Sequence, residues 1–316
     1  MIQKVCCLIN PSSGNKAGSR LIAELKEIAD RYFPKVEIVE TSLELLDQQV
    51  KLASRSDLIL IGGGDGTISQ VVNRLYPTEA IVGIIPLGTA NDLSRELGID
   101  KLFKQAGLAG LLAHYRNAPI RDLSLWRLEY GFECKQSRLF CNYVSFGFDA
   151  SVVAECERWR GHLGKRPFFA KRIFTKFLYA LAAFKQLLQP GYPQVTIKAL
   201  DDEFFQQHLF PDWRGVFVSN VRAVMGWGVA NQSGSPFDNN CEVQIVKSIL
   251  NYLCMLASYK LPLPKPVLLD AAKGWEIDGF VDTIAVQVDG EYASEVKCQK
   301  CRIMRTGKVG VLVANQ

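Results

Sequence analysis

Short apolar runs alternate with helix-like patterns over residues 1–120. The apolar runs predict strands at residues 5–9, 36–40, 58–61 and 81–85. The segments between them predict helices at residues 21–32, 43–54 and 68–75, with two more beginning at Asn91 and Lys101. Strands and helices that alternate in this way predict an α/β N-terminal domain with a parallel sheet and helices on both faces.

From residue 121 onward, hydrophobic and polar residues alternate with a period of two, which is typical of antiparallel strands. The runs 123–130 and 139–146 are separated by a short polar stretch and predict a hairpin. Further strands are expected at residues 195–200, 215–219, 243–246, 283–288 and 298–304, and a helical segment at residues 167–189. We therefore predict a mainly antiparallel β second domain with a helical insertion, spanning residues 121–305. A strand at about residues 306–316 is expected to return to the first domain.

Two strands of the first domain end in glycine-rich turns that also contain an aspartate, at residues 62–67 and 86–92. Glycines allow backbone N–H groups to converge on an anion, and the N-terminus of the following helix adds its positive dipole end. A third turn, Asn-Pro-Ser-Ser-Gly at residues 10–14, follows the first strand. One such turn alone would more often serve the topology of the fold. Three turns at one sheet edge favour a phosphate site, and Asp65 and Asp92 suggest Mg-nucleotide chemistry.

Composition limits the class of protein. The chain has 316 residues, of which 48% are hydrophobic, and a formal net charge of +5. This length predicts two domains with substantial cores. The sequence contains no apolar stretch long enough to span a bilayer and begins like a strand rather than a signal peptide, so we expect a soluble cytoplasmic protein. Nine cysteines are read as reduced thiols, and with three histidines a zinc site at Cys298 and Cys301 is not favoured.

Several classes of nucleotide enzyme are excluded by what the sequence lacks. It contains no GxxxxGK[ST] run and no H-R-D or D-F-G motif, which excludes P-loop enzymes and protein kinases. The run at residues 62–67 has no third glycine at the spacing of the GxGxxG pattern, and it follows the third strand rather than the first. A dehydrogenase is therefore disfavoured.

Taken together, these motifs resemble a known family. Residues 10–14, 63–67 and 86–93 are similar to the catalytic domain of diacylglycerol kinases and their relatives, which include bacterial lipid kinases, sphingosine kinases and ceramide kinases. The stretch at residues 142–150, N-Y-V-S-F-G-F-D-A, resembles the opening of the family's second domain, and residues 288–291 resemble its late V-D-G-E motif. The resemblance covers nearly the whole chain.

The resemblance implies roles for particular residues. It implies an ATP site formed by Asn10, Pro11, Ser12, Ser13, Gly14, Thr41, Gly63, Gly64, Asp65, Gly66, Thr67, Gly88, Thr89 and Asn91. It implies Mg²⁺ held by Asp65, Asp92 and Asp238, and catalysis by Glu291 as general base, with Asp289 and Asp65. A carboxylate that accepts the proton of an alcohol suits phosphoryl transfer. Asp-Gly between two strands is also a strong hairpin signal, and both interpretations can hold together.

One stretch departs from the family pattern. Members usually have Asp-Gly, two apolar residues and a further Asp in the second domain, where they help to bind a structural Mg²⁺. Here the corresponding residues are Asp238, Asn239, Asn240, Cys241 and Glu242. The acids are kept, and Asn can partly replace Gly because it tolerates the left-handed conformation. The resemblance therefore leaves this second metal site open.

A basic and aromatic segment suggests where a membrane would bind. Between Arg158 and Lys176 the chain has many Lys and Arg, no Asp or Glu, and several aromatic residues. Such a segment suits an anionic membrane surface, and the loop from Trp159 to Phe169 is its best candidate. The apolar face of the helix that follows, which includes Leu181 and Phe184, is expected to be core. No nucleic-acid motif accompanies the basic residues, so we do not expect a nucleic-acid partner.

Three functions are compatible with the sequence. The first is an ATP-dependent lipid kinase that phosphorylates the hydroxyl of diacylglycerol or a similar lipid while bound peripherally to a membrane. The second is a kinase of a related fold acting on NAD or another soluble alcohol, although the P-L-G-T-A-N-D run at residues 86–92 and the basic segment disfavour it. The third is a catalytically silent lipid-binding module, which would have no use for a base at Glu291. The identity of the lipid and a homodimer are both left open.

Overall fold

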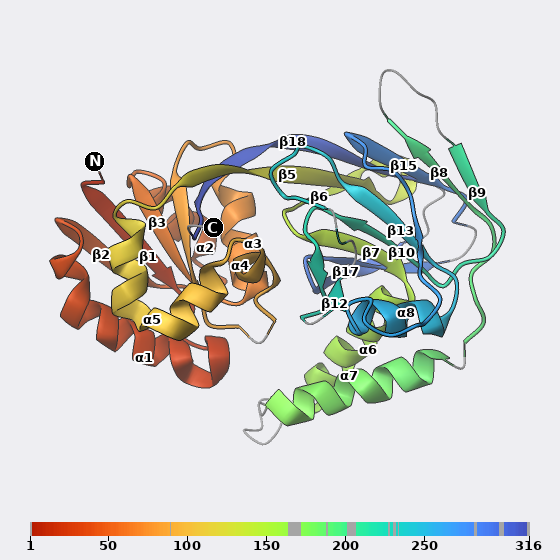
Figure 1. Ribbon diagram of the computed structural model, residues 1–316, viewed down its shortest axis with the longest axis horizontal. Helices are drawn as coiled ribbons and strands as arrows, with labels where there is room; N and C mark the ends of the chain where they lie inside the picture. The colour runs from red at the N-terminus through yellow and green to blue at the C-terminus, as the bar shows by residue number, and fades with distance from the viewer. Residues whose placement is uncertain are drawn as a thin grey trace. The chain divides into compact units, whose positions relative to one another are not determined.

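The chain forms two units, and Figure 1 labels their helices and strands. This computed structural model describes residues 2–88, 90–163, 172–187, 189–200, 207–226, 228–229, 232, 234–280, 283–296 and 300–314. The first unit comprises Met1–Leu125 and Gly307–Gln316, and the second comprises Trp126–Thr306. Two long strands, β5 (Ile120–Tyr130) and β18 (Lys300–Leu312), run from one unit into the other.

The first unit is an α/β domain with a parallel sheet in the strand order β2-β1-β3-β4. Its strands are β1 (Lys4–Ile9), β2 (Lys35–Glu40), β3 (Leu58–Gly63) and β4 (Ile81–Pro86). Every residue of β3 is buried, as expected of a central strand covered on both faces. The C-terminal part of β18 continues the sheet, with Val311 paired in parallel with Val82. The fold class predicted for this part of the chain is confirmed.

Helices cover both faces of this sheet. They are α1 (Ser13–Ile28), α2 (Leu46–Ala53), α3 (Asp65–Leu75), α4 (Asp92–Glu96) and α5 (Ile99–Tyr115), with a 3₁₀ turn η1 (Ala29–Arg31). The connection from β1 to β2 moves along the sheet in one direction, and the connections from β2 to β3 and from β3 to β4 move in the other. Because such crossovers are right-handed, α1 lies on one face of the sheet and α2 and α3 lie on the other. α1 begins at Ser13, earlier than the predicted start at residue 21, since its first turns are small and polar and show no apolar pattern.

The second unit contains two antiparallel arrangements of strands. One is the sheet β14-β13-β10-β7-β16-β17, formed by β7 (Tyr143–Gly147), β10 (Gly215–Ser219), β13 (Glu242–Val246), β14 (Val267–Leu268), β16 (Ile284–Val288) and β17 (Glu291–Val296). The other joins β18, β15 (Gly274–Asp278), β8 (Val195–Ala199) and β9 (Gln207–Phe210), with β5 paired to β18 and β6 (Gln136–Phe140) paired to β5. The short strands β11 (Ala223–Val224) and β12 (Gly228–Val229) form a separate ribbon. The predicted antiparallel domain is confirmed.

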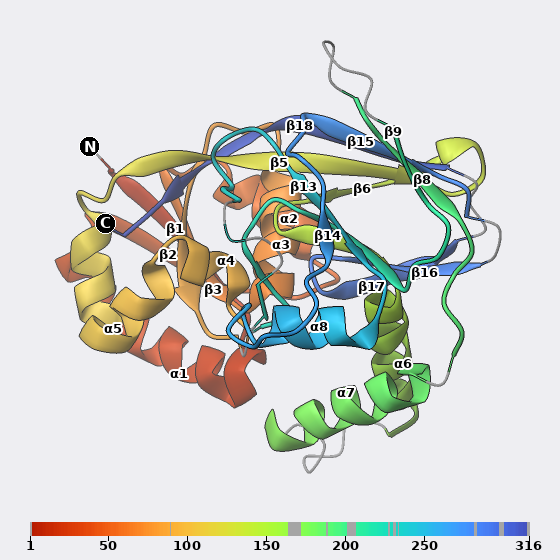
Figure 2. The same cartoon turned by 45° about the vertical axis from the view of Figure 1, so that its right-hand side comes forward.

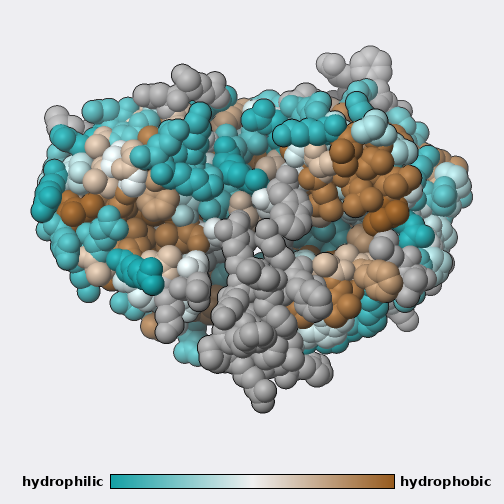
Figure 3. Space-filling model, turned by 60° about the horizontal axis from the view of Figure 1, so that its bottom comes forward, coloured by the Kyte–Doolittle hydropathy of each residue, from teal (hydrophilic) through white to brown (hydrophobic). Residues whose placement is uncertain are grey.

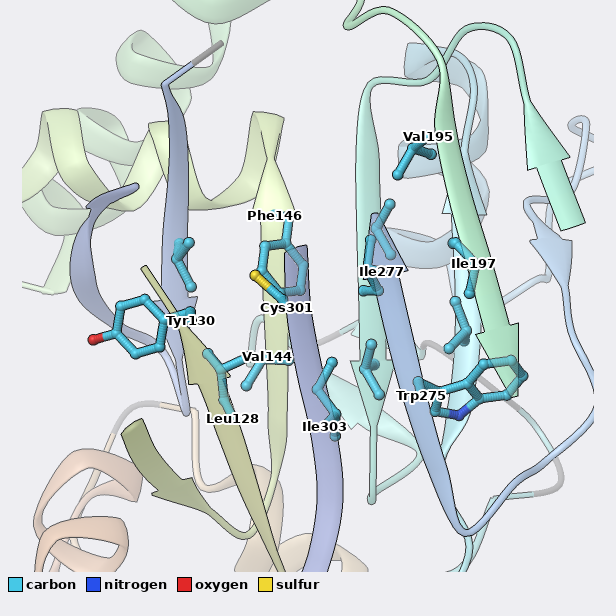
Figure 4. Close-up of a cluster of buried hydrophobic side chains, with 14 of the residues drawn as sticks. Leu128, Tyr130, Val144, Phe146, Val195, Ile197, Trp275, Ile277, Cys301 and Ile303 are labelled. Atoms are coloured by element: carbon cyan, nitrogen blue, oxygen red, sulfur yellow. The ribbon is translucent and has the colours of Figure 1, made fainter. Parts of the chain in front are cut away.

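The two arrangements pack face to face over one hydrophobic core, part of which is drawn in Figure 4. β7 contributes Val144 and Phe146, β15 contributes Trp275 and Ile277, and β18 contributes Ile303. These side chains alternate with outward-facing residues along each strand, which is the pattern that the period of two predicted. Cys301 is buried in this core, and Cys298 lies outside the described residues.

Three helices lie on the outer side of the β7 sheet, as Figures 1 and 2 both show. They are α6 (Phe148–Leu163), α7 (Arg172–Leu187) and α8 (Ile249–Leu256). α6 and α8 contact the strands of this sheet, and α7 packs on α6. Their shared core cluster includes Cys156, Leu178 and Met255, packed on Phe217 of β10. The helical insertion is thus confirmed, but α6 and α8 were missed by the sequence analysis. In the part of the chain that the structure describes, no helix combines the length and apolar character needed to cross a bilayer.

Two further expectations for this unit were wrong. Residues 139–146 are not one strand of a hairpin, because β6 pairs with β5 whereas β7 belongs to the other sheet. The chain turns between these strands at Cys141 and Asn142, where the backbone amides donate to the carboxylate of Asp289. On α7, Leu181 and Phe184 are exposed, so the predicted apolar face is not the face that packs on the core.

Candidate functional site

Backbone hydrogen bonds bring the predicted phosphate turns of the first unit together at the carboxyl ends of its strands. The N–H of Asn10 donates to the carbonyl of Gly62 at 2.8 Å, which joins the end of β1 to the end of β3. The N–H of Leu87 donates to the carbonyl of Gly63 at 2.9 Å, which joins β3 to β4. The N–H of Thr41, after β2, donates to the carbonyl of Ile9 at 2.8 Å. Segments far apart in the sequence therefore form one edge.

Glycine is required where these turns approach one another. A Cβ on Gly88 would lie 2.6 Å from the Cα of Gly64, and a Cβ on Gly14 would lie 2.4 Å from the carbonyl oxygen of Leu87. Gly14 also has a φ of 61°, which side chains rarely tolerate. Such close backbone contact is the geometry by which glycine turns surround a phosphate.

The N-termini of two helices open onto this edge. α1 starts directly after the Asn10 turn and has no acidic residue in its first turn and no side-chain cap. α3 starts at Asp65, and Gly64 as its N-cap has no side chain to bond the first amides. First-turn amides with no capping side chain, together with the helix dipole, form an anion site. α1 therefore suits a phosphate alone, whereas α3 brings a carboxylate to the same place.

The side chain of Asn10 ties two of the turns to each other. Its Nδ2 donates to Thr67 Oγ1 at 2.9 Å, and its Oδ1 accepts from the N–H of Ser12 at 3.0 Å. The amide therefore orients both the Thr67 hydroxyl on α3 and the Pro11–Ser12 backbone. Of the remaining residues predicted for this site, Ser13 and Gly66 lie on α1 and α3, and Thr89 falls outside the described residues.

The two aspartates predicted to hold Mg²⁺ have different surroundings. Asp65 is half-buried, and its Oδ1 accepts from the N–H of Leu93 at 3.3 Å. Asp92 is buried and forms an ion pair with Arg95. Within the described residues there is no group of three His, Cys, Asp or Glu side chains suited to a metal ion. Mg²⁺ is commonly bound by one or two carboxylates together with substrate phosphates, and the half-buried Asp65 is more accessible for that chemistry than the buried Asp92.

Asn91 has an unusual conformation that the sequence did not reveal. Its φ of 53° is left-handed, and its Nδ2 donates to the buried Asp100 at 3.1 Å. Its Oδ1 is buried and has no hydrogen-bond partner among the described residues, and a Cβ on Gly88 would lie 2.7 Å from it. Strained, incompletely bonded polar groups of this kind cluster at ligand sites.

In the second unit, Asp289, Gly290 and Glu291 form the turn between β16 and β17. Asp289 and Gly290 both have positive φ, at 51° and 86°, as in a tight hairpin. The Asp289 carboxylate is buried and accepts from the backbone N–H groups of Cys141, Asn142 and Tyr143 at 3.1, 2.8 and 3.1 Å. Asp289 therefore anchors the turn, while Glu291 is only half-buried at the start of β17.

A buried polar chain supports the same turn from behind. The N–H of Gly290 donates to Gln287 Oε1 at 2.6 Å, and Gln287 Nε2 donates to Asp149 Oδ2 at 3.4 Å. Ser145 Oγ donates to the same oxygen at 2.7 Å. Burial raises the pKa of Asp149 to about 6, because the charged carboxylate is removed from water. Asp149 and Gln287 were not identified as site residues from the sequence, although Asp149 lies in the N-Y-V-S-F-G-F-D-A motif.

The predicted second metal site is held by local bonds. Asp238 Oδ1 accepts from the N–H of Asn240 at 2.9 Å, which closes a small turn. Asn239 has a φ of 65°, so it does adopt the left-handed conformation expected where the family has glycine. Glu242 is buried on β13, and its Oε1 and Oε2 lie near Gly234. Asp238 belongs to the second unit and Asp65 and Asp92 to the first, so the three predicted ligands come from separate units.

A cavity of about 390 Å³ in the second unit lies apart from the predicted residues. Its lining includes Glu155, whose carboxylate forms ion pairs with Arg158 at 2.8 Å and Lys185 at 2.6 Å. None of the predicted site residues lines it. Trp159, at the start of the predicted membrane loop, is partly buried against the helical core cluster. Residues 164–169 of that loop lie outside the described residues.

Two family models match the chain. The diacylglycerol kinase catalytic domain matches residues 4–121, and the diacylglycerol kinase accessory domain matches residues 139–292. The first match contains all the phosphate turns, and the second contains both Asp149 and the Asp289–Glu291 turn.

Sequence relatives agree with these matches. Diacylglycerol kinase 2 of Arabidopsis thaliana is 26% identical over 307 residues, which is 90% of this chain and 42% of that protein. Diacylglycerol kinase 1 of the same plant is 25% identical over 76% of this chain and 35% of its own length. The chain thus spans less than half the length of these plant relatives. A diacylglycerol kinase of Staphylococcus haemolyticus is 24% identical over 94% of this chain and 85% of its own.

Solved structures share the fold. A crystal structure of a diacylglycerol kinase from Bacillus anthracis superimposes with a TM-score of 0.68 over 99% of this chain and 97% of that one, at 19% identity. Yeast NADH kinase complexed with NADH gives a TM-score of 0.53 at 13% identity, over 99% and 84% of the two chains. With both domain models matched in order, the chain belongs to the diacylglycerol kinase family.

Proposed function

We propose that this protein is a lipid kinase that transfers the γ-phosphate of ATP to the hydroxyl of diacylglycerol or a similar lipid at a membrane surface. The observation that carries the proposal is the edge of the first unit, where the turns after β1, β3 and β4 are joined by the hydrogen bonds of Asn10 and Leu87. Such an edge binds a polyphosphate through backbone amides rather than through a lysine.

In this mechanism each part of the first unit has a separate task. The first turn of α1 binds phosphate through amides, since it has no acidic residue that would repel the ligand. Thr67, oriented by Asn10, donates a hydroxyl hydrogen bond from the adjacent turn. Mg²⁺ bound with the nucleotide would neutralise charge that develops on the transferred phosphoryl group, and Asp65 is the residue that would hold it.

In the second unit, Glu291 is proposed to accept the proton of the lipid hydroxyl as it attacks. A half-buried carboxylate at the start of β17 can meet a ligand, whereas the buried Asp289 carboxylate is occupied by three backbone amides. We assign Asp289 to positioning the turn and Glu291 to the proton transfer. Because general-base catalysis contributes about 10²–10⁴-fold, removal of Glu291 is expected to lower turnover by that factor.

The proposal is tested with labelled ATP, Mg²⁺ and a panel of acceptors. The panel contains diacylglycerol, monoacylglycerol, sphingosine and ceramide in mixed micelles, and NAD in solution. We expect label in diacylglycerol, and a loss of about 10²–10⁴-fold in kcat for Glu291→Gln with an unchanged unfolding curve. Asp65→Asn is expected to lose activity and Mg-ATP affinity together. Glu133→Gln, which alters an exposed ion-paired carboxylate of the second unit, is the matched control and should retain activity.

Other results would change the assignment. Label in NAD alone would favour a soluble acceptor, as in the yeast neighbour, and full activity of Glu291→Gln would remove that residue as the base. Binding of ATP without label in any acceptor would favour a silent lipid-binding module.

A further inference from the structure

The second unit exposes a group of leucines on and beside α8. Leu250 and Leu253 on α8, Leu261 in the loop that follows and Leu268 on β14 have exposed fractions of 42, 44, 53 and 49%. We call these four residues the α8 surface. Figure 3 shows hydrophobic residues gathered on the right of the face it views, which is the part of the second unit where α8 lies in Figure 1. Contiguous apolar patches on a protein surface usually mark a binding site.

Helix and strand geometry place these leucines on one side of the unit. Leu250 and Leu253 are three residues apart and share the helix face opposite the buried Asn251, Tyr252, Cys254 and Met255. Leu268 pairs directly with Gln244 of β13, and Gln244 Nε2 donates to the Tyr259 hydroxyl at 3.2 Å, beyond the end of α8. Paired residues of neighbouring strands point to the same face, so Leu268 lies on the face that carries α8.

The surface is held in a fixed conformation. Asn251 Nδ2 donates to the carbonyls of Pro264 and Lys265 at 2.9 and 3.1 Å, while its Oδ1 accepts from the N–H groups of Lys247 and Ser248. One buried side chain therefore joins the loop to the start of α8. The loop also contains Pro262, Pro264 and Pro266, which have no N–H to leave unbonded if the loop enters an apolar phase.

The charge around the α8 surface has one sign. From residue 247 to residue 269 the sequence contains Lys247, Lys260 and Lys265 and no Asp or Glu. All three lysines are exposed, and among the described residues none of them forms an ion pair. The Nζ of Lys265 lies 6.0 Å from the centre of the Tyr259 ring, beside the same loop. The Nζ of Lys247 lies instead 5.6 Å from the centre of the Phe210 ring on β9, so Lys260 and Lys265 are the lysines beside the loop. Leucines flanked by lysines match the acyl and headgroup layers of an anionic bilayer.

We infer that the α8 surface docks onto an anionic lipid bilayer, with its leucines in the acyl boundary and Lys260 and Lys265 at the headgroups. A symmetric contact with a second copy would instead bring the same lysines together and is opposed by their repulsion. The inference rests on the proposed function, since a lipid kinase must bind the membrane that contains its substrate. The docking itself is independent of ATP and of catalysis.

The experiment measures binding to vesicles in the absence of nucleotide. Vesicles of phosphatidylcholine alone are compared with vesicles that also contain phosphatidylserine, and bound protein is measured by flotation. We expect Leu250→Gln with Leu253→Gln to weaken binding at least about 10-fold, because exposed apolar groups no longer enter the bilayer. Replacement of Lys260 and Lys265 with Gln should weaken binding about 30-fold on vesicles containing phosphatidylserine and little on phosphatidylcholine alone.

Leu209→Gln is the matched control. Leu209 on β9 is 57% exposed, and its neighbour Phe210 points into the core between the sheets, so Leu209 lies on the outer face of its own sheet, whereas α8 packs on β13 of the other sheet. This variant should bind vesicles as the parent protein does. Unfolding curves establish that the variants are folded, as expected for changes at exposed positions.

The outcomes separate this inference from the proposed function. If the leucine pair variant binds vesicles as well as Leu209→Gln does, the α8 surface is not the docking site. If light scattering shows a dimer that the leucine changes dissociate, the surface belongs to a second copy and the inference is overturned. If vesicle binding follows the expected pattern but no acceptor is labelled by ATP, the docking surface stands and the proposed kinase activity fails.

Discussion

The candidate site of the first unit is formed mainly by backbone groups, whereas that of the second unit is formed mainly by side chains. In the first unit, glycines let three turns approach one another, and helix N-termini supply amides. In the second unit, the side chains of Asp289, Gln287 and Asp149 hold a single hairpin turn in place through hydrogen bonds. A phosphate is bound by many similar donors, whereas a base must be held at one position, and the two kinds of construction reflect that difference.

The largest expected effect comes from adding one methyl group at Gly88, in the candidate site of the first unit. A Cβ on Gly88 would meet the Cα of Gly64 at 2.6 Å, so the two turns must separate. Gly88→Ala is expected to weaken ATP binding about 100-fold or more and to lower the free energy of unfolding by about 1–3 kcal/mol. Calorimetric titration with Mg-ATP and urea unfolding measure the two effects.

Gly310→Ala provides the control for that experiment. A Cβ there would meet Ile120 at 3.4 Å, which is an ordinary contact, and the parent ATP affinity should be kept. Unchanged ATP affinity in Gly88→Ala would contradict the role assigned to close backbone approach.

A change in the pH dependence of stability is expected from Asp149, the buried acid that supports the hairpin turn of the second unit. Burial raises the pKa of Asp149 from 3.8 to about 6, so the folded protein binds this proton more tightly than the unfolded chain. The contribution of Asp149 to stability is therefore greatest below about pH 4, falls as the pH rises to 6, and is constant above that. The pKa difference corresponds to about 3 kcal/mol.

Asp149→Asn is expected to remove this part of the pH dependence while the amide still accepts from Ser145. The measurement is urea unfolding of parent and variant at several pH values between 4 and 7, with the difference between them as the result. Parallel curves for the two proteins would show that Asp149 does not titrate in this range.

The smallest expected change in stability separates the two acids of the hairpin turn. Asp289→Asn keeps an acceptor for the amides of Asn142 and Tyr143 but loses the charge, so we expect a loss of about 1–2 kcal/mol in stability. Glu291→Gln should leave stability unchanged and lower kcat. If Asp289→Asn instead lowers kcat as much as Glu291→Gln at full stability, Asp289 takes part in the chemistry and our assignment is wrong.

The difference in construction also explains what the sequence could predict. The turns at residues 10–14 and 63–67 could be predicted because glycine, Asn and Pro after an apolar strand mark them locally. Gln287 and Asp149 could not be predicted, since each is a single polar residue inside an apolar stretch. They belong to the site because they bond to each other across 138 positions of the sequence. The single strand predicted at residues 139–146 was wrong for the same reason: the break at Cys141 is set by Asp289, which comes much later in the chain.

The path of β18 has a consequence for how the protein forms in the cell. Val311 pairs with Val82, and Ala314 N–H donates to the carbonyl of Leu97 at 3.0 Å, so the first unit is completed by residues made after the whole second unit. While the ribosome is still translating residues 126–306, the free side of β4 has no neighbouring strand. An open strand edge is a template for mispairing with another chain, so the nascent first unit is exposed to aggregation until β18 is in place.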